Sequence, residues 1–70
     1  MKKKLITKLK EYRVVAGLSQ QELANMVDVR RETIIRLEKG EYNPSLQLAM
    51  DIAEIFKTKV EEIFFFESIE

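Results

Sequence analysis

Two short apolar stripes at helical spacing, with room for only a tight turn between them, lie within residues 19–38. Ser19 and Glu22 have the spacing of a capping box, in which the serine oxygen accepts the Glu22 backbone N–H and the glutamate side chain returns a bond. Gly17 stands just before this signal and is typical of the end of a preceding helix. The pattern therefore predicts that a new helix begins here and covers about 20–27.

The segment 30–38 is expected to form the next helix, after a turn around Asp28 and Val29. At 100° per residue, its side chains divide between two arcs. The arc expected to face the core holds Arg30, Thr33, Ile34 and Leu37, and the arc expected to face outward holds Arg31, Glu32, Ile35 and Arg36. The guanidinium of Arg30 must then reach solvent, while the aliphatic part of its side chain packs against the core. Two short helices joined by this turn have the size of a helix-turn-helix, with its core at about 19–38.

Three further helices are expected, at 7–16, 46–56 and about 60–65. Thr7 is the candidate N-cap of the first of these helices, and Ser45 is the candidate N-cap of the second. The inward stripe expected for the second is Leu46, Ala49, Ile52, Ala53 and Phe56, widened by Leu48 and Ile55. In the last helix, Val60, Ile63 and Phe64 are expected to be buried. The chain is thus expected to be one mainly α domain over 1–70.

The C-terminal segment 65–70 fits two alternatives, the end of the last helix or a strand paired with residues 3–6. The longest unbroken apolar run, 63–66, is far shorter than the ~20 residues that a membrane helix needs. The apolar run at the N-terminus is also too short for a signal peptide. We therefore expect a cytoplasmic protein that does not enter a membrane.

Basic and acidic residues are unevenly divided along the chain, although the net charge is zero. Residues 1–36 hold nine Lys or Arg and four Asp or Glu, a net charge of +5. Residues 37–70 hold three Lys or Arg and eight Asp or Glu, a net charge of −5. This asymmetry favours one face for a polyanion and another face turned away from it, with scattered solvated charge as the alternative.

The chain contains neither histidine nor cysteine. This composition excludes Ser-His and Cys-His catalytic pairs and any His-ligated zinc site. Its two glycines cannot make a phosphate-cradling loop, and its carboxylates show no pairing typical of acid–base catalysis. We therefore expect no enzyme, no cofactor or metal, and no small-molecule ligand.

The outward arc of 30–38 is the candidate base-reading surface. The major groove of B-DNA admits one α-helix, and an arginine there can bond two acceptors of one guanine. Arg31 and Arg36 are the candidates for this contact, and Ile35 between them is a candidate for touching a thymine methyl group. Glu32 has two alternative roles, accepting from a cytosine amino group or orienting Arg36 four residues on. The competing interpretation is a solvated face that reads nothing.

Donors suited to phosphate flank this helix in the sequence. Ser19 and Gln20 open one helix, and Asn43 and Ser45 precede another, where free backbone N–H groups favour an anion. Lys39 directly follows the candidate reading helix. Such contacts fix the register of a protein on DNA, whereas base contacts specify the sequence.

A series of motifs extends in order over about 8–64: Gly17-Leu18-Ser19-Gln20-Gln21-Glu22-Leu23-Ala24, Val29, Thr33-Ile34, Leu37-Glu38-Lys39-Gly40 and Asn43-Pro44-Ser45-Leu46. In this series the chain resembles the XRE family of phage repressor and Cro-type transcriptional regulators. The resemblance implies a five-helix, lambda-repressor-like domain that binds operator DNA as a homodimer. Small stand-alone members of the family also imply a short two-stranded β-ribbon made by the N- and C-termini.

The resemblance further implies roles for individual residues. Gln20 would contact phosphate and support readout, and the base-reading positions would be Arg31, Glu32 and Arg36. Arg13 and Glu38 match a pair that the family uses as an internal salt bridge between the first and third helices.

Two residues depart from the family pattern. Arg30 stands where similar proteins commonly have a serine or threonine N-cap, so the helix start lacks a cap unless Asp28 substitutes, and Arg30 is instead a candidate phosphate contact. Glu32 replaces the usual glutamine, and a carboxylate repels phosphate. The operator preference of relatives is therefore not transferable to this chain.

An aromatic cluster, Phe64, Phe65 and Phe66, lies near the C-terminus. Phe64 is expected to reach the core, and the cluster is expected to form a dimer seam, because exposed aromatics rarely go unused. Val60 and Asn43 are candidates for the same seam. The partners expected are thus double-stranded DNA and a second copy of the chain, in a transcriptional repressor. An antitoxin or another protein-interaction module with secondary DNA binding is the alternative function.

Overall fold

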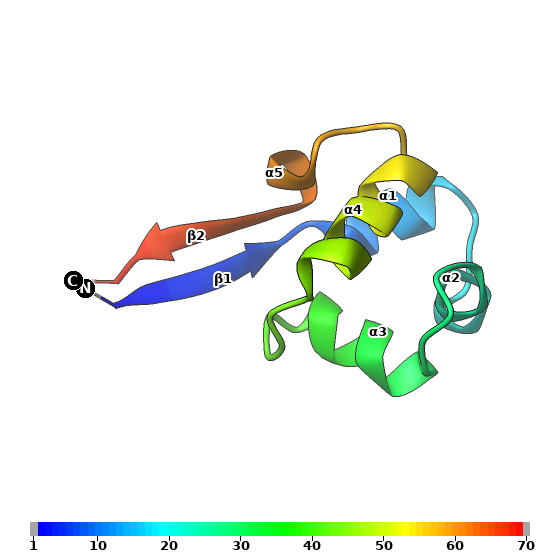
Figure 1. The fold of residues 1–70 in the computed structure, drawn as a ribbon, viewed down its shortest axis with the longest axis horizontal. Coiled ribbons are helices and arrows are strands. Elements are labelled where there is room, and N and C mark those ends of the chain that lie inside the picture. The colour runs from blue at the N-terminus through cyan, green and yellow to red at the C-terminus, as the bar shows by residue number, and fades with distance from the viewer. Residues whose placement is uncertain (1, 70) are drawn as a thin grey trace.

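In a computed structural model that describes residues 2–69, the elements in chain order are β1 (Lys3–Thr7), α1 (Leu9–Val15), α2 (Gln20–Met26), α3 (Arg31–Glu38), α4 (Leu46–Ile55), α5 (Val60–Ile63) and β2 (Phe64–Ser68) (Figure 1). The helices gather at one end, and the two strands project from them as a ribbon. α4, with ten residues, is the longest helix of this described part. No helix there is long and apolar enough to cross a membrane. The predicted fold, mainly helical with a ribbon made by the two chain ends, is confirmed.

The core draws side chains from every helix. Over residues 2–69, the largest fully buried side chains are Leu9, Leu23, Ile34, Leu37, Ile52 and Ile63. Burial of one such side chain contributes about 1.5–3 kcal/mol. In a domain this small, each of these contacts is a large part of the net stability.

α1, α2, α3 and α4 all end in a Schellman motif. The residue after each C-cap is left-handed: Gly17, Asp28, Gly40 and Lys57, with φ of 74°, 57°, 72° and 53°. The next residue then donates its N–H to the carbonyl five positions back, at 3.0–3.1 Å. Glycine takes this conformation freely, whereas a residue with a Cβ pays about 1 kcal/mol. The predicted helix end at Gly17 is confirmed. The ends of α2 and α4 are formed instead by Asp28 and Lys57, whose left-handed backbone is strained.

Two predicted helix bounds are wrong, and the others agree within one residue. The first helix begins at Leu9 because Thr7 ends β1, and Lys8 occupies the N-cap position. Thr7 contributes differently, since its Oγ1 accepts the Leu9 N–H at 3.2 Å. The last helix ends at Ile63 because Phe64 turns extended, with φ −127° and ψ 131°, and begins β2. Of the two alternatives for the C-terminal segment, the strand is found, over Phe64–Ser68, and Glu70 lies outside the described residues.

Two side chains predicted to face the core are exposed. Leu46 is 75% exposed at the first position of α4, and the buried stripe starts only at Leu48 and Ala49. Arg30 is exposed in an extended N-cap conformation, and its side chain makes no capping hydrogen bond. Helical periodicity predicts the direction of a side chain only within the body of a helix. It therefore gives the wrong direction for Arg30 and Leu46, which stand where their helices begin.

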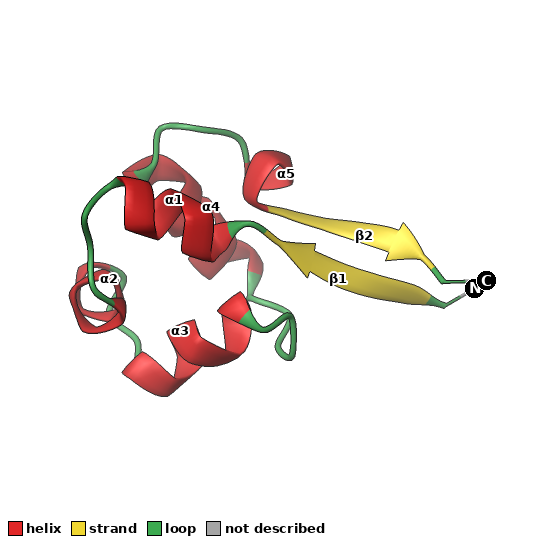
Figure 2. Cartoon of the chain, turned by 180° about the vertical axis from the view of Figure 1, so that it is seen from behind, coloured by secondary structure: helices red, strands yellow, loops and turns green. Residues whose placement is uncertain are grey.

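β1 and β2 pair antiparallel, with Leu5 opposite Phe66 and Ile6 opposite Phe65. Because directly opposed side chains share a face, Leu5 and Phe66 lie on one face of the ribbon, and Ile6 and Phe65 lie on the other. Leu5 belongs to the core, so the first face continues from the core toward the free end of the ribbon (Figure 2).

Candidate nucleic-acid interface

α2 and α3 form the predicted helix-turn-helix, joined by residues 27–30. Val29 closes the turn, because its N–H donates to Ala24 O at 3.0 Å and its side chain packs against the core. α3 lies at the opposite edge of the molecule from α5 (Figures 1 and 2). Its outer face is therefore directed away from the acidic C-terminal helices.

The outward arc of α3 gathers charged side chains. Arg31, Glu32 and Arg36 are exposed, whereas Ile34 of the same helix is fully buried and holds the inner face to the core. Ile35 is only half-exposed and lies at the margin of the arc. The structure thus brings together three of the four side chains assigned to base reading as an open ridge, with Ile35 beside it.

The guanidinium of Arg36 lies over the ring of Tyr42, with Cζ 5.6 Å from the ring centroid. This is the geometry of a cation–π contact. Glu32, the other candidate for orienting Arg36, makes no ion pair with it, since Arg13–Glu38 is the only salt bridge found among residues 2–69. The sequence did not pair Tyr42 with Arg36, because nothing in the local spacing connects a loop residue to the last turn of a helix.

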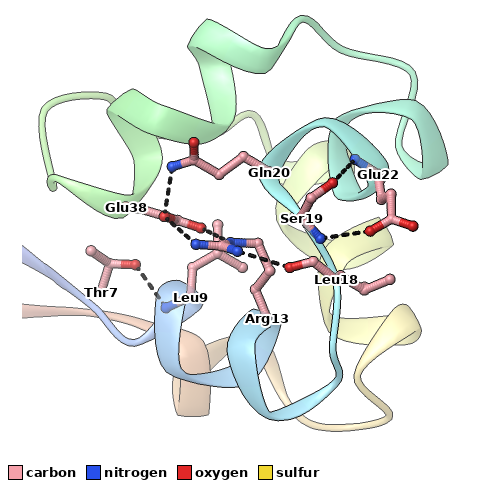
Figure 3. Close-up of polar contacts among 8 residues, drawn as sticks. All are labelled: Thr7, Leu9, Arg13, Leu18, Ser19, Gln20, Glu22 and Glu38. Atoms are coloured by element: carbon pink, nitrogen blue, oxygen red, sulfur yellow. Dashed lines mark hydrogen bonds and ion pairs between the residues drawn. The ribbon is translucent and has the colours of Figure 1, made fainter.

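Arg13 on α1 and Glu38 at the end of α3 form the internal pair that the family resemblance implied (Figure 3). Arg13 Nε donates to Glu38 Oε2 at 2.5 Å, and Arg13 Nη2 donates to Oε1 at 3.2 Å. Arg13 Nη1 also donates to Leu18 O at 2.8 Å, in the segment that leads into α2. The side chains are 11% and 5% exposed, so this network fixes α3 against α1 from inside the domain.

Gln20 joins the same network, because its Nε2 donates to Glu38 Oε1 at 3.1 Å (Figure 3). Its amide is therefore directed toward the protein interior. The predicted phosphate role of Gln20 is compatible with this arrangement only through its backbone N–H or after a rotation of the side chain.

At the start of α2, the Glu22 carboxylate supplies a negative charge close to the helix N-terminus. Ser19 Oγ accepts the Glu22 N–H at 3.0 Å, and Glu22 Oε1 accepts the Ser19 N–H at 2.8 Å (Figure 3). The predicted capping box is confirmed. The hydrogen bond from the Ser19 backbone, followed by that from its side chain, holds the pKa of Glu22 below its ordinary value. This carboxylate lowers the positive potential at the start of α2 and so weakens its attraction for a phosphate.

The start of α4 is free of such a carboxylate. Ser45 Oγ accepts the Leu48 N–H at 3.1 Å, and the first turn of this helix contains no acidic residue. Asn43 lies exposed just before it. Two further predicted phosphate contacts, Arg30 before α3 and Lys39 after it, are also exposed. Donors thus lie at both ends of the α3 ridge.

An apolar groove of about 310 Å³ lies where the ribbon meets α4 and α5, lined by Leu5, Asn43, Pro44, Leu46, Ala49, Val60, Phe64 and Phe66. Phe66 is 54% exposed and Leu46 is 75% exposed at its rim. Met50, one turn after Leu46 on α4, is a further exposed apolar side chain. Sequence reasoning missed the exposure of Leu46 because it placed this residue in the core.

Four of the five predicted seam residues line this groove, namely Asn43, Val60, Phe64 and Phe66. Phe64 is 6% exposed, so it forms the floor of the groove. Phe65 lies on the opposite face of the ribbon, where Lys8 Nζ stands 5.9 Å from its ring centroid. One flat contact therefore cannot include both Phe65 and Phe66, because strand alternation separates them.

Known proteins similar to this chain support the same interpretation. A family model described as helix-turn-helix matches residues 9–63. An uncharacterized HTH-type transcriptional regulator of Archaeoglobus fulgidus is 55% identical over 64 residues, 91% of this chain and 90% of the relative. The cryptic phage CTXphi transcriptional repressor RstR of Vibrio cholerae is 30% identical over 57 residues, 81% of this chain and 51% of that protein. The crystal structure of the restriction-modification controller protein C.AhdI from Aeromonas hydrophila matches with a TM-score of 0.69 at 31% identity, over 77% of this chain and 82% of that one.

Proposed function

This chain belongs to the helix-turn-helix family of DNA-binding transcriptional regulators, and from this premise we propose that it represses transcription by binding an operator sequence-specifically as a homodimer. The observation that carries the proposal is the exposed ridge of Arg31, Glu32 and Arg36 on α3, backed by the buried inner face of the same helix. The major groove of B-DNA admits one α-helix, so the exposed face of α3 can enter it.

The base contacts are assigned by the chemistry of each side chain. Arg31 and Arg36 each donate to the O6 and N7 acceptors of a guanine, and Glu32 accepts from a cytosine amino group. Ile35 reaches a thymine methyl group with the part of its side chain that the core leaves open. Because Glu32 repels phosphate, it restricts the operator to sites that offer it a donor.

Phosphate contacts flank this ridge. The N-terminus of α4, with Ser45 and the preceding Asn43, offers donors with no competing carboxylate. Arg30 and Lys39 supply positive charge at the two ends of α3. Ser19 and Gln20 contribute less, because Glu22 neutralises the start of α2 and Glu38 holds the Gln20 amide.

The second copy binds at the apolar groove. Exposed aromatic and aliphatic side chains at its rim, Phe66 and Leu46, lose water contact when the same groove of a partner covers them. A two-fold dimer uses one patch twice, so the groove residues and Met50 face their own counterparts. The two α3 helices then enter successive major grooves about 34 Å apart on a pseudo-palindrome.

Repression is the mode proposed, because a protein bound at its operator excludes other proteins from the same stretch of DNA. The name of the related phage repressor agrees with this mode. Because the proposed target is an operator, the same proposal places the protein in the cytoplasm.

Selection of bound duplexes from a random pool, followed by sequencing, tests the proposal. We expect an inverted repeat whose half-sites lie one helical turn apart, and we expect the double variant Arg31→Ala/Arg36→Ala to lose the enrichment. Val15→Ala on α1, the most exposed large apolar side chain of the described residues at 88%, is the matched control and keeps it. Retention of no duplex at low salt, together with capture of a protein partner, would support the antitoxin-like alternative instead.

A further inference from the structure

We infer that Tyr42 is a positioning residue for DNA readout, whose ring holds the Arg36 guanidinium in the conformation that enters the major groove. The inference rests on the proposed function of α3 and adds a residue outside the helix to it. The observation is the stacking of the Arg36 head group on the Tyr42 ring, at 5.6 Å from the centroid.

The backbone fixes the place of this ring relative to Arg36. Glu41 donates its N–H to Arg36 O at 3.0 Å, so the loop that carries Tyr42 is closed by the main chain of the arginine itself. Gly40, left-handed at φ 72°, runs so close to β1 that a Cβ there would meet Leu5 O at 3.0 Å. The loop is thus held between α3 and β1, and the ring of Tyr42 stands at a defined position beside Arg36.

The ring of Tyr42, and not a neighbouring charge, orients the guanidinium. Within residues 2–69, neither Arg36 nor Tyr42 makes a side-chain hydrogen bond, and Glu32 forms no salt bridge with Arg36. A cation–π contact leaves the N–H groups of a guanidinium free around its edge, where a guanine would accept them. Tyr42 is 38% exposed and Arg36 is exposed, so the stack lies at the protein surface and is accessible to DNA.

Holding a long side chain in one conformation removes part of the ordering cost of binding. We therefore expect Tyr42→Leu to lose about threefold to tenfold affinity for the selected operator, and little for random duplex. Tyr42→Phe keeps the ring and is the matched control, with affinity within about twofold of the wild type. In an Arg36→Ala background, Tyr42→Leu should cause no further loss on the operator.

The measurement is fluorescence anisotropy on operator and on random duplex, with the wild type, Tyr42→Leu, Arg36→Ala, the double variant and the Tyr42→Phe control. Equal losses from Tyr42→Leu with and without Arg36 would overturn the inference, because the ring would then act independently of the arginine. A wild type that binds no duplex would overturn the proposed function, and the inference with it, before any variant is compared.

A readout on the free protein covers the case in which Tyr42→Leu does not fold. In the wild type, the side-chain Nε–Hε group of Arg36 should show an upfield ring-current shift and slower motion than that of Arg31, which has no aromatic contact among the described residues. Tyr42→Phe should preserve both signatures. Identical shifts and mobility for the two arginines in the wild type would contradict the positioning role.

Discussion

Arg13 and Glu38 lie 25 positions apart in the chain and join the first helix to the last residue of the helix assigned to DNA reading. Two hydrogen bonds join the side chains, which are nearly buried. Arg13 also donates to Leu18 O, and Glu38 also accepts from Gln20. A pair of this kind controls the position of α3, because its partners come from α1, from the segment before α2 and from α2 itself. The orientation of the reading ridge is thus set from inside the domain.

Arg13→Ala should therefore destabilise the fold rather than alter the choice of operator. Removing one partner leaves the Glu38 carboxylate buried without its cation, at a cost of about 3–5 kcal/mol. Urea denaturation of the wild type, Arg13→Ala and the exposed control Lys10→Ala measures this cost. A folded Arg13→Ala variant with the wild-type midpoint and a changed site preference would assign Arg13 to recognition instead.

Asp28→Gly should stabilise the protein by roughly 1 kcal/mol, because Asp28 is left-handed at φ 57° and glycine removes that strain. Lys57→Gly, at φ 53° after α4, should give a gain of similar size far from the α2–α3 turn. Thermal denaturation of both variants checks the prediction. A loss of stability on Asp28→Gly would mean that the aspartate side chain stabilises the turn by more than its backbone strain costs.

The capping box at Ser19 and Glu22 should make part of the stability pH-dependent. The folded-state pKa of Glu22 is lowered, so its contribution is present above the unfolded pKa and is lost as pH falls through the folded pKa. Glu22→Gln keeps the capping geometry but cannot titrate there. Melting temperatures between about pH 7 and about pH 3 should fall less steeply for Glu22→Gln than for the wild type, and parallel curves would remove Glu22 from the acid response.

Phe66→Lys should convert the proposed dimer to a monomer, since it places a charge at the rim of the apolar groove. Operator affinity should then fall about 100-fold or more, because the two half-sites are no longer bound by linked domains. Val15→Lys on α1 introduces the same charge at another exposed apolar residue and should remain dimeric. Sedimentation equilibrium measures both, and a dimeric Phe66→Lys protein would exclude the groove as the seam.

Much of this molecule follows from local signals in the sequence. The capping box at Ser19, the stop at Gly17 and the buried spacing of Ile34 and Leu37 each depend on residues within one or two helical turns. Such signals predict the helix-turn-helix and the outward ridge of α3 without knowledge of the rest of the chain. They also leave the C-terminal segment open, since Phe64 and its neighbours fit a helix or a strand until β1 is placed beside them.

The parts that sequence reasoning missed depend on contacts between distant segments or on the ends of helices. Leu46 follows the helical period of its stripe, yet it stands at the first position of α4 and faces solvent. Tyr42 meets Arg36 only because the loop folds back on the last turn of α3. Asp28 and Lys57 take a conformation typical of glycine, and their side chains give no sign of it.

The most direct test of the reading role of α3 is an NMR titration of the labelled protein with its selected operator duplex. We predict that the largest shift changes fall on Arg31, Glu32 and Arg36 and on the start of α4, with α5 unchanged. Random duplex should shift the phosphate-facing residues but leave the Arg31 and Arg36 side-chain signals unshifted. Large changes on α5 or the ribbon, with the outward arc of α3 unperturbed, would contradict the assignment of this helix to the major groove.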